Sequence, residues 1–382
     1  MRTAAFCRSS CGSFSLATDS RMQRAVVEAA AAVIRKADRV HPADAVLRAE
    51  LRGARRLSPA QRSEVARAVF DYYRWFGWLE PRPGLRDQLE RASDLARAFA
   101  ETPQRFSEEE LVRRSVPVWL AESMEVTPAF ARALQARPKL WLRARKGQGS
   151  VLAQQLGSAH VSEGVPDAIE YFGDDDLFHH PGFRSGDFEI QDISSQLVGR
   201  IADPQPGQTW WDACAGEGGK LLHLSELMDN KGLIWASDRA AWRIEKLKRR
   251  AARARVFNYR AAAWDGSAKL PTRRKFDGIL VDAPCSGVGT WGRNPHARWT
   301  TTPDDVRELS GVQRELLEHV KPALKPRGKL VYAVCTLTKS ETVGVAEGSG
   351  TAHAELKLVV TTWLRPEELG GNGMFVAVWQ QG

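Results

Sequence analysis

The sequence predicts an α/β fold: a mostly parallel sheet with helices on both faces and an antiparallel strand at its edge, preceded by an all-helical region. From about residue 185, apolar runs of strand length alternate with helical stretches, as in TWWDAC, GLIWASD, FDGILVDAP and GKLVYAVC. Such alternation is typical of a parallel sheet. The last two runs, LKLVVTTWL and MFVAVW, are separated by the turn signal GGNG and not by a long helix, which indicates the antiparallel edge.

The residues from 22 to about 99 predict a group of packed helices. MQRAVVEAAAAVIRKA combines high helix propensity with an apolar stripe. Farther on, Ser58 is a candidate N-cap, Pro59 stands at the first helical position and Gln61 completes a capping box. The aromatic residues that follow recur at helical spacing, which favours a place in the core over stacking on nucleic acid. They are Tyr72, Tyr73, Trp75, Phe76 and Trp78.

Charge and cysteine content narrow the class of protein. The 382 residues carry a formal net charge of +9, which suits a polyanion such as RNA and equally a basic surface that only maintains solubility. The cysteines are odd in number and widely spaced, so a secreted disulfide scaffold does not fit, and no metal site is expected. They are Cys7, Cys11, Cys214, Cys285 and Cys335.

The amino-terminal end lacks the apolar core of a secretory signal, and no run approaches the roughly 18 apolar residues of a membrane span. We expect residues 1–21 to be a disordered tail; a start at Met22 and a transit peptide are the alternatives. We also expect a cytoplasmic protein that does not bind membranes, and a monomer without an obligate protein partner.

A ligand site is predicted where WWDACAGEGGKLLHL joins a strand, a glycine-bearing turn and a helix. Ligands of doubly wound sheets bind at the carboxyl ends of strands, and Gly216, Gly218 and Gly219 allow close approach. The glycine spacing does not match that of dinucleotide-binding proteins, which disfavours a nicotinamide oxidoreductase. Asp212 at the strand end would repel a phosphate but suits an ammonium or sulfonium group.

Two more acids end the strands that follow. Asp238 ends IWASD, about twenty residues farther on, where a carboxylate can accept hydrogen bonds from both hydroxyls of a ribose. Asp265 ends or follows a third strand and could reach an adenine amino group. The three acids together predict an S-adenosylmethionine site.

Two cysteines stand just past two separate strands, Cys285 in LVDAPCSGVG and Cys335 in LVYAVCTLTKSE. C5 of cytosine becomes nucleophilic when a thiolate adds to C6, and C5 can then attack an electrophilic methyl group. A second polar group near the adduct would help to expel the enzyme after transfer. A role as small buried hydrophobic residues fits one cysteine easily and two less well.

The motifs DACAGEGGK, DAPCSGVGTWGRNPHARW and YAVCTLTKSE, in this order and spacing, resemble the Nol/Nop/Sun (RsmB-like) family of RNA cytosine-5 methyltransferases. The resemblance implies a Rossmann-like class I methyltransferase domain at 185–382. It also implies a NusB-like helical RNA-binding domain at 22–105 and a connecting α/β subdomain at 106–184.

The resemblance also assigns roles. The residue matching the attacking cysteine is Cys335, and Cys285 matches the cysteine that assists product release; chemistry alone would leave this order open. Asp282 matches the residue that hydrogen-bonds the cytosine edge, and Lys220 a lysine near cofactor and target. Contacts with the cofactor are implied for Asp212, Ala213, Cys214, Ala215, Gly216, Gly218, Lys220, Asp238, Arg243, Asp265 and Asp282.

The sequence departs from the family pattern at several positions without losing a reacting group. Glu217 stands where a proline is more usual, Leu221 where a threonine often is, and Val334 replaces the residue before the attacking cysteine. Arg143-Ala144-Arg145 replaces the more usual Arg-Val-Asn.

We therefore expect an S-adenosylmethionine-dependent RNA (cytosine-5) methyltransferase whose target is an unstacked cytosine, by analogy in ribosomal small-subunit RNA. A tRNA cytosine is the first alternative. An RNA-binding assembly factor without turnover is the second.

Overall fold

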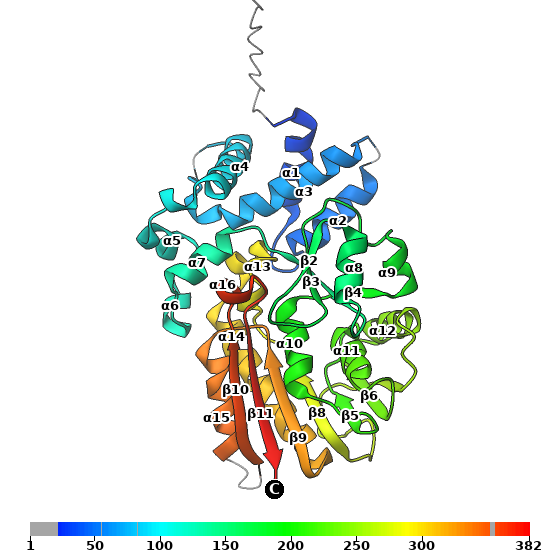
Figure 1. The fold of residues 1–382 in the computed structure, drawn as a ribbon. Coiled ribbons are helices and arrows are strands. Elements are labelled where there is room, and N and C mark those ends of the chain that lie inside the picture. Colours follow the sequence, from blue (N-terminus) through cyan, green and yellow to red (C-terminus); the bar gives the residue numbers. More distant parts are fainter. Residues whose placement is uncertain (1–21, 55, 82, 352–355) are drawn as a thin grey trace, which may run out of the picture.

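The computed structural model describes residues 22–54, 56–81, 83–351 and 356–382. The tail predicted at 1–21, with Cys7 and Cys11, lies outside the described residues. The chain begins with a helical region and continues through a small sheet into a large one (Figure 1). The helices of the first region are α1 (Arg24–Lys36), α2 (Ala43–Gly53), α3 (Pro59–Arg74), η1 (Phe76–Trp78), α4 (Leu85–Glu101) and η2 (Pro103–Arg105).

The helical region forms as its sequence predicts. The hydroxyl of Ser58 accepts from the Gln61 amide, the Gln61 side chain accepts from the Ser58 amide, and Pro59 opens α3, so the capping box is confirmed. The aromatic residues supply the core, with Trp75 fully buried and its ring 4.9 Å from that of Trp78. Phe76 is the exception, because 41% of it is exposed.

A second group of short helices leads into a small antiparallel sheet with strand order β2-β3-β1-β4. Its last strand, β4, follows residue 184, so this sheet extends past the boundary predicted there; the division into domains stays a prediction. The elements are α5 (Glu108–Arg114), α6 (Leu120–Ser123), α7 (Pro128–Gln135), β1 (Leu140–Ala144), α8 (Gly149–Leu156), β2 (Ala159–Val161), β3 (Ala168–Tyr171), α9 (Pro181–Ser185) and β4 (Phe188–Ile190).

The large sheet has the order β10-β11-β9-β8-β5-β6-β7. The five strands from β9 to β7 are parallel. β11 pairs antiparallel with β9 on one side and with β10 on the other, which confirms the predicted sheet. The strands are β5 (Thr209–Asp212), β6 (Leu233–Asp238), β7 (Tyr259–Ala263), β8 (Phe276–Asp282), β9 (Leu324–Val334), β10 (Leu356–Leu364) and β11 (Met374–Gln381).

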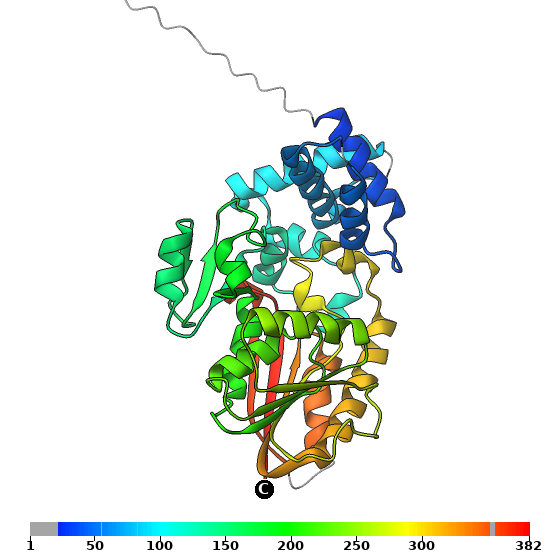
Figure 2. The ribbon, with the colours of Figure 1, turned by 90° about the vertical axis from the view of Figure 1, so that its right-hand side faces the viewer.

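Helices cover both faces of this sheet (Figure 2). Trp210 and Trp211, adjacent in β5, are both fully buried and point to opposite faces. One packs with α10, α11 and α12, the other with α14 and α15. The helices are α10 (Ile193–Ala202), α11 (Gly219–Leu227), α12 (Ala241–Arg253), α13 (Pro295–Thr300), α14 (Pro303–Val320), α15 (Val343–Thr351) and α16 (Pro366–Leu369), with short turns η3 (Val288–Thr290), η4 (Lys321–Ala323) and η5 (Lys339–Glu341).

The strand order reverses between β5 and β8. The chain runs from β5 outward to β6 and β7, and then returns to the other side of β5 for β8 and β9. The loops that leave the carboxyl ends of β5 and β8 therefore diverge, and a crevice opens between them. This is where the sequence predicts the ligand.

The helical region is attached to the large sheet through α13. The Arg298 guanidinium is fully buried and donates to the carbonyls of Ser115 and Leu134, each at 2.9 Å, and to the Gln135 side chain at 3.1 Å. The neighbouring Trp299 indole donates to the Tyr73 carbonyl at 2.7 Å. One helical turn thus satisfies backbone groups at the ends of several helices, groups that would otherwise be buried without partners.

We predict that Arg298→Met lowers the free energy of unfolding by about 2–4 kcal/mol, because several buried carbonyls lose their donors. Urea titration followed by tryptophan fluorescence measures the change. The control is Arg307→Ala on α14, whose side chain is 76% exposed; it should change stability by less than about 0.5 kcal/mol. Equal effects of the two substitutions would contradict the anchoring role.

Candidate active site

A cavity of about 680 Å³ opens at the carboxyl ends of β5, β6, β8 and β9, a volume within the usual range of ligand pockets. Of the residues predicted for the site, all but Gly218 line it. Gly218 has φ +87° and is the N-cap residue just before α11; a side chain there would meet Leu247 of α12 at 2.8 Å. Glycine at this position therefore allows α11 and α12 to pack closely.

The two cysteine sulfurs lie 3.2 Å apart in this cavity. Their loops meet because β8 and β9 are parallel neighbours in register, with Asp282 opposite Ala333 at the strand ends. The pKa of Cys285 lies well above the ordinary thiol value, because of the hydrogen bond with Cys335, burial, and the nearby charges of Cys335 and Glu341. Cys285 therefore holds its proton more tightly than an ordinary thiol.

A buried lysine and a carboxylate lie beside the sulfurs. Lys220 of α11 donates to Asp282, the last residue of β8, with 2.6 Å between Nζ and Oδ2. Burial lowers the pKa of Lys220, but the charge and hydrogen bond of Asp282 outweigh it and the net pKa is raised. Lys220 is therefore a fixed cation within the site.

Asp212, at the end of β5, is a buried carboxyl group with unsatisfied hydrogen-bond acceptors. It is fully buried, and neither of its oxygens accepts a hydrogen bond of ordinary geometry among the described residues, although the Leu221 amide is close enough to lower its pKa slightly. Burial, reinforced by the charge of Asp282 and opposed by Lys220, raises its pKa to about 7. Because a buried charge without a partner is costly, this carboxylate favours a cationic ligand.

The other two acids are held by backbone amides. The Asp238 carboxylate accepts from Gly216 at 3.0 Å and from Ala240 at 2.8 Å, and Arg243 lies 3.7 Å from it. Gly216 has φ +55°, and the space that a side chain would fill is open. Asp265 lies exposed at the rim, where hydrogen bonds from Ser267 lower its pKa.

Glu341 is the residue that sequence reasoning missed. Its buried carboxylate accepts from the Ser286 amide at 2.8 Å, the Ser286 hydroxyl at 2.5 Å, the Thr338 hydroxyl at 2.8 Å and the Gln313 amide at 3.0 Å. Ser286 follows one cysteine and Thr338 follows the other, so Glu341 joins the two cysteine loops. The acid at the end of YAVCTLTKSE was the available signal.

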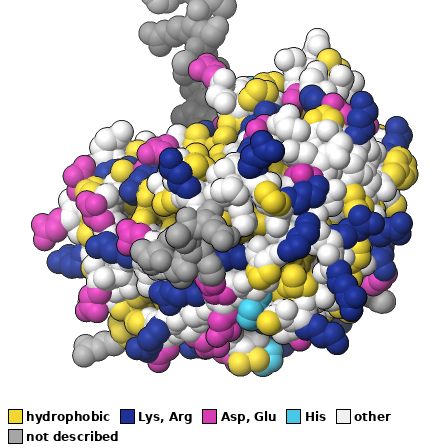
Figure 3. All heavy atoms as spheres, turned by 90° about the horizontal axis from the view of Figure 1, so that it is seen from below, with side chains coloured by type: hydrophobic (Ala, Val, Ile, Leu, Met, Phe, Trp, Pro, Cys, Tyr) yellow, Lys and Arg dark blue, Asp and Glu magenta, His cyan; other side chains and the backbone are white. Residues whose placement is uncertain are grey.

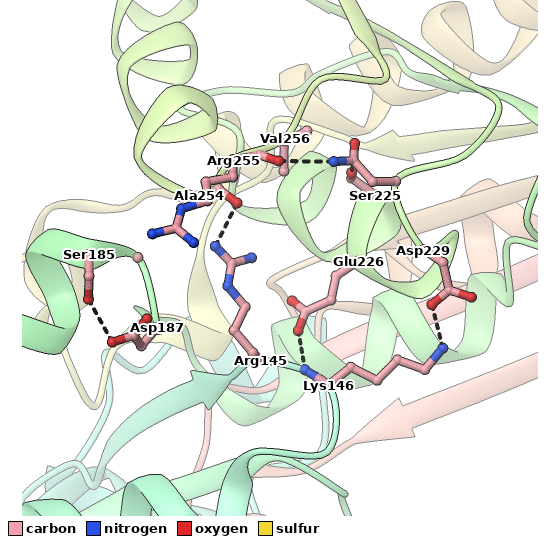
Figure 4. A pocket seen from close by; sticks show the side chains of 12 residues that line it. Arg145, Lys146, Ser185, Asp187, Ser225, Glu226, Asp229, Ala254, Arg255 and Val256 are labelled. Carbon is pink, nitrogen blue, oxygen red and sulfur yellow. Dashed lines mark hydrogen bonds and ion pairs between the residues drawn. The ribbon is translucent and has the colours of Figure 1, made fainter.

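A second cavity, of about 370 Å³, lies on the outer side of α11 (Figure 4). Two of its basic groups have partners: Arg145 donates to the Ala254 carbonyl at 2.6 Å, and Lys146 Nζ to Asp229 at 2.7 Å. The buried Arg143 side chain pairs with Glu226 and donates to Gln191. Arg143 keeps the arginine of the family pattern and joins the small sheet to α11, whereas Arg145, which replaces the usual asparagine, joins it to the end of α12.

The comparisons place this site in a family. Residues 200–379 match the family model described as 16S rRNA methyltransferase RsmB/F. Over 300 residues the chain is 30% identical to the ribosomal RNA small subunit methyltransferase B of Pectobacterium carotovorum subsp. carotovorum (strain PC1), covering 71% of this chain and 69% of that protein. The chain belongs to the RsmB/F family. The resemblance seen in the motifs is confirmed.

Two further comparisons give the extent of the similarity in sequence and in fold. The probable ribosomal RNA small subunit methyltransferase B of Synechocystis sp. (strain ATCC 27184 / PCC 6803 / Kazusa) is 33% identical over 270 residues, and the match spans 66% of this chain and 60% of that relative's length. The crystal structure of PH0851 has a TM-score of 0.76 at 24% identity and covers 94% of this chain and 98% of its own. The predicted fold class is therefore confirmed. No described helix is both long and apolar enough to cross a membrane.

In this RsmB/F-family chain we predict that Glu341→Gln loosens both cysteine loops, because an amide cannot accept from all the donors that face the carboxylate. Hydrogen–deuterium exchange should show at least about tenfold faster exchange of the Ser286 amide. The matched control, Glu315→Gln on the exposed side of α14, should leave that amide unchanged. If the Ser286 amide is protected equally well in Glu341→Gln, Glu341 does not hold the two loops together.

Proposed function

We propose that the protein is an S-adenosylmethionine-dependent RNA (cytosine-5) methyltransferase that acts on 16S rRNA. The observation that carries the proposal is the pair of sulfurs 3.2 Å apart, in one cavity with the unpaired carboxylate of Asp212. Family membership and the names of the relatives support the reaction and the RNA. A cytosine that reaches the sulfurs must leave its stack, so a single-stranded or loop position is proposed.

The residues of the cavity fit the proposed cofactor. When bound, S-adenosylmethionine supplies an electrophilic methyl group. Asp212, which lacks a partner, would hold its ammonium group, and Asp238 retains lone pairs for ribose hydroxyls after accepting two amides. Gly216 leaves room for close approach, and Asp265 at the rim would face the adenine.

The two cysteines would act in sequence. The Cys335 thiolate forms a bond to C6 of cytosine, which makes C5 nucleophilic. Asp282 and Lys220 would lie beside the edge of the cytosine ring. Alkylation of Cys335 removes the hydrogen bond that is the largest cause of the high pKa of Cys285. Cys285 can then release its proton to solvent and take the proton that leaves C5 after methyl transfer. The bond between Cys335 and C6 breaks as the C5–C6 double bond re-forms, and the Cys335 thiolate is restored.

The regions outside the large sheet would serve the RNA. We propose that the helices at 22–105 form the NusB-like RNA-binding domain and that 106–184 connects it to the catalytic domain at 185–382. We also propose that the protein acts in the cytoplasm as a monomer. If S-adenosylmethionine produces no thermal shift, the RNA-binding assembly factor without turnover becomes the better reading.

We predict that Cys335→Ala abolishes methylation, because no thiolate remains to activate C5. In contrast, Cys285→Ala should accumulate a covalent protein–RNA adduct that survives a denaturing gel, because the C5 proton has no acceptor. Incorporation of labelled methyl groups into RNA, together with the gel, measures both results. Normal methylation by both variants would contradict the mechanism.

We also predict that cofactor affinity depends on pH through Asp212. Its pKa of about 7 means that lowering the pH protonates the carboxyl group, and the neutral group no longer attracts an ammonium. Affinity measured by calorimetry should be several-fold weaker at pH 6 than at pH 7.5. Asp212→Asn should bind weakly with little change between these pH values; a variant as pH-dependent as the unmodified protein would assign the titration to another group.

A further inference from the structure

Helix α12 has one apolar and one basic face. Its apolar residues Ile244, Leu247 and Ala251 are buried against the sheet. The opposite side carries residues at successive spacings of four, three and four, which places them on one face of the helix. They are Trp242, Lys246, Arg249 and Arg253. Seen from below, Lys and Arg gather on the right of the molecule, the side on which α12 lies in Figure 1 (Figure 3).

A groove of about 420 Å³ lies between this face and the region of α9. Its aromatic wall is Phe178, which is 64% exposed, and Phe183, with 5.2 Å between the two ring centroids. The Arg253 guanidinium stacks on the Phe183 ring at 3.8 Å. Trp242 lies on the same face of α12 but outside the lining of the groove; it is 55% exposed, and Lys246, which does line the groove, lies over its ring at 4.7 Å. Exposed rings beside cations are the usual components of a site for single-stranded nucleic acid.

The groove keeps an excess of positive charge. The buried Glu189 is shared by Arg250 at 2.9 Å and Arg253 at 2.5 Å. Lys246 pairs with Glu217, but both side chains are well exposed, so this ion pair is weak. Arg249 is exposed and forms no ion pair with any residue that the structure describes. Four cations thus line the groove against two carboxylates.

The groove continues into the active-site cavity. Ile190, Glu217 and Arg250 line both. A ligand confined to the cavity would not need this extension, whereas a polymer that places one base beside the sulfurs must pass its neighbouring nucleotides outward. The extension is basic and aromatic, which matches phosphates and unstacked bases.

We propose that the RNA strand next to the target cytosine lies single-stranded along this groove. Its phosphates would contact Arg249 and Arg253, and its bases would stack on Phe178 and Trp242. The inference rests on the proposed function, because it takes the substrate to be RNA, and it adds the path of the strand and the groups that hold it.

The test is equilibrium binding of a fluorescently labelled, 20-nucleotide single-stranded RNA with one cytosine, measured by anisotropy over a range of KCl concentrations without cofactor. Arg249→Ala should weaken binding and reduce the slope of log affinity against log salt by about 0.7, the value for one phosphate contact on a single strand. Phe178→Ala and Trp242→Ala should each weaken binding about tenfold without changing the slope.

The matched control is Arg273→Ala. Arg273 is exposed and precedes β8, at the end of the sheet opposite the cavity, so its loss should change neither affinity nor slope. Equal effects of Arg273→Ala and Arg249→Ala on RNA affinity would mean that the net positive charge of the protein attracts RNA without a specific site, and would contradict the proposed path. Groove variants that bind RNA like the unmodified protein would contradict it too. Methylation by the unmodified protein is assayed separately. If it methylates RNA and the groove variants bind normally, this inference alone fails; if it binds no RNA, both proposals fail.

Discussion

The parallel pairing of β8 with β9 is the constraint on which the site depends. The two strands end level with each other, so the loops that follow them leave the same edge of the sheet and carry Cys285 and Cys335 into contact. Glu341 holds the two loops together, because it accepts hydrogen bonds from the loop of each cysteine. Two sulfurs that are fifty residues apart in the sequence are thereby brought within hydrogen-bond distance, 3.2 Å. A shift of register by one residue would turn these side chains to the other face.

The site is stabilised unevenly. Lys220 and Asp282 neutralise each other, and Glu341 is satisfied by hydrogen bonds, but Asp212 is left without a partner. The folded state raises the pKa of Asp212 from 3.8 to about 7, so it binds the proton more tightly than the unfolded chain. This contribution to stability is present below about pH 4 and is lost as the pH rises toward 7. Ionisation of Asp212 near neutral pH therefore places an unfavourable charge in the protein interior, and a cationic ligand would offset its cost.

The sequence predicted most of the architecture because alternation and capping are local signals. The capping box at Ser58, the antiparallel edge and the meeting of strand-end acids with two cysteines follow from local pattern and the geometry of parallel sheets. Other features depend on contacts between distant segments and have no local signature. Glu341 acts through Ser286 and Gln313, Arg298 through helices that lie more than 160 residues earlier, and Gly218 through Leu247 of another helix. Phe76 shows the converse, since helical spacing alone could not tell that this ring would remain partly exposed.

The segment from Cys285 to Trp299 has a mechanical consequence. It begins at one of the two paired sulfurs, and within fifteen residues it inserts a guanidinium and an indole among the helices that precede the large sheet. A short stretch of backbone thus joins the loop of Cys285 to the helices that precede the sheet. Because so few residues lie between the two attachments, a displacement of those helices relative to the sheet would have little slack to absorb it before it reached that loop.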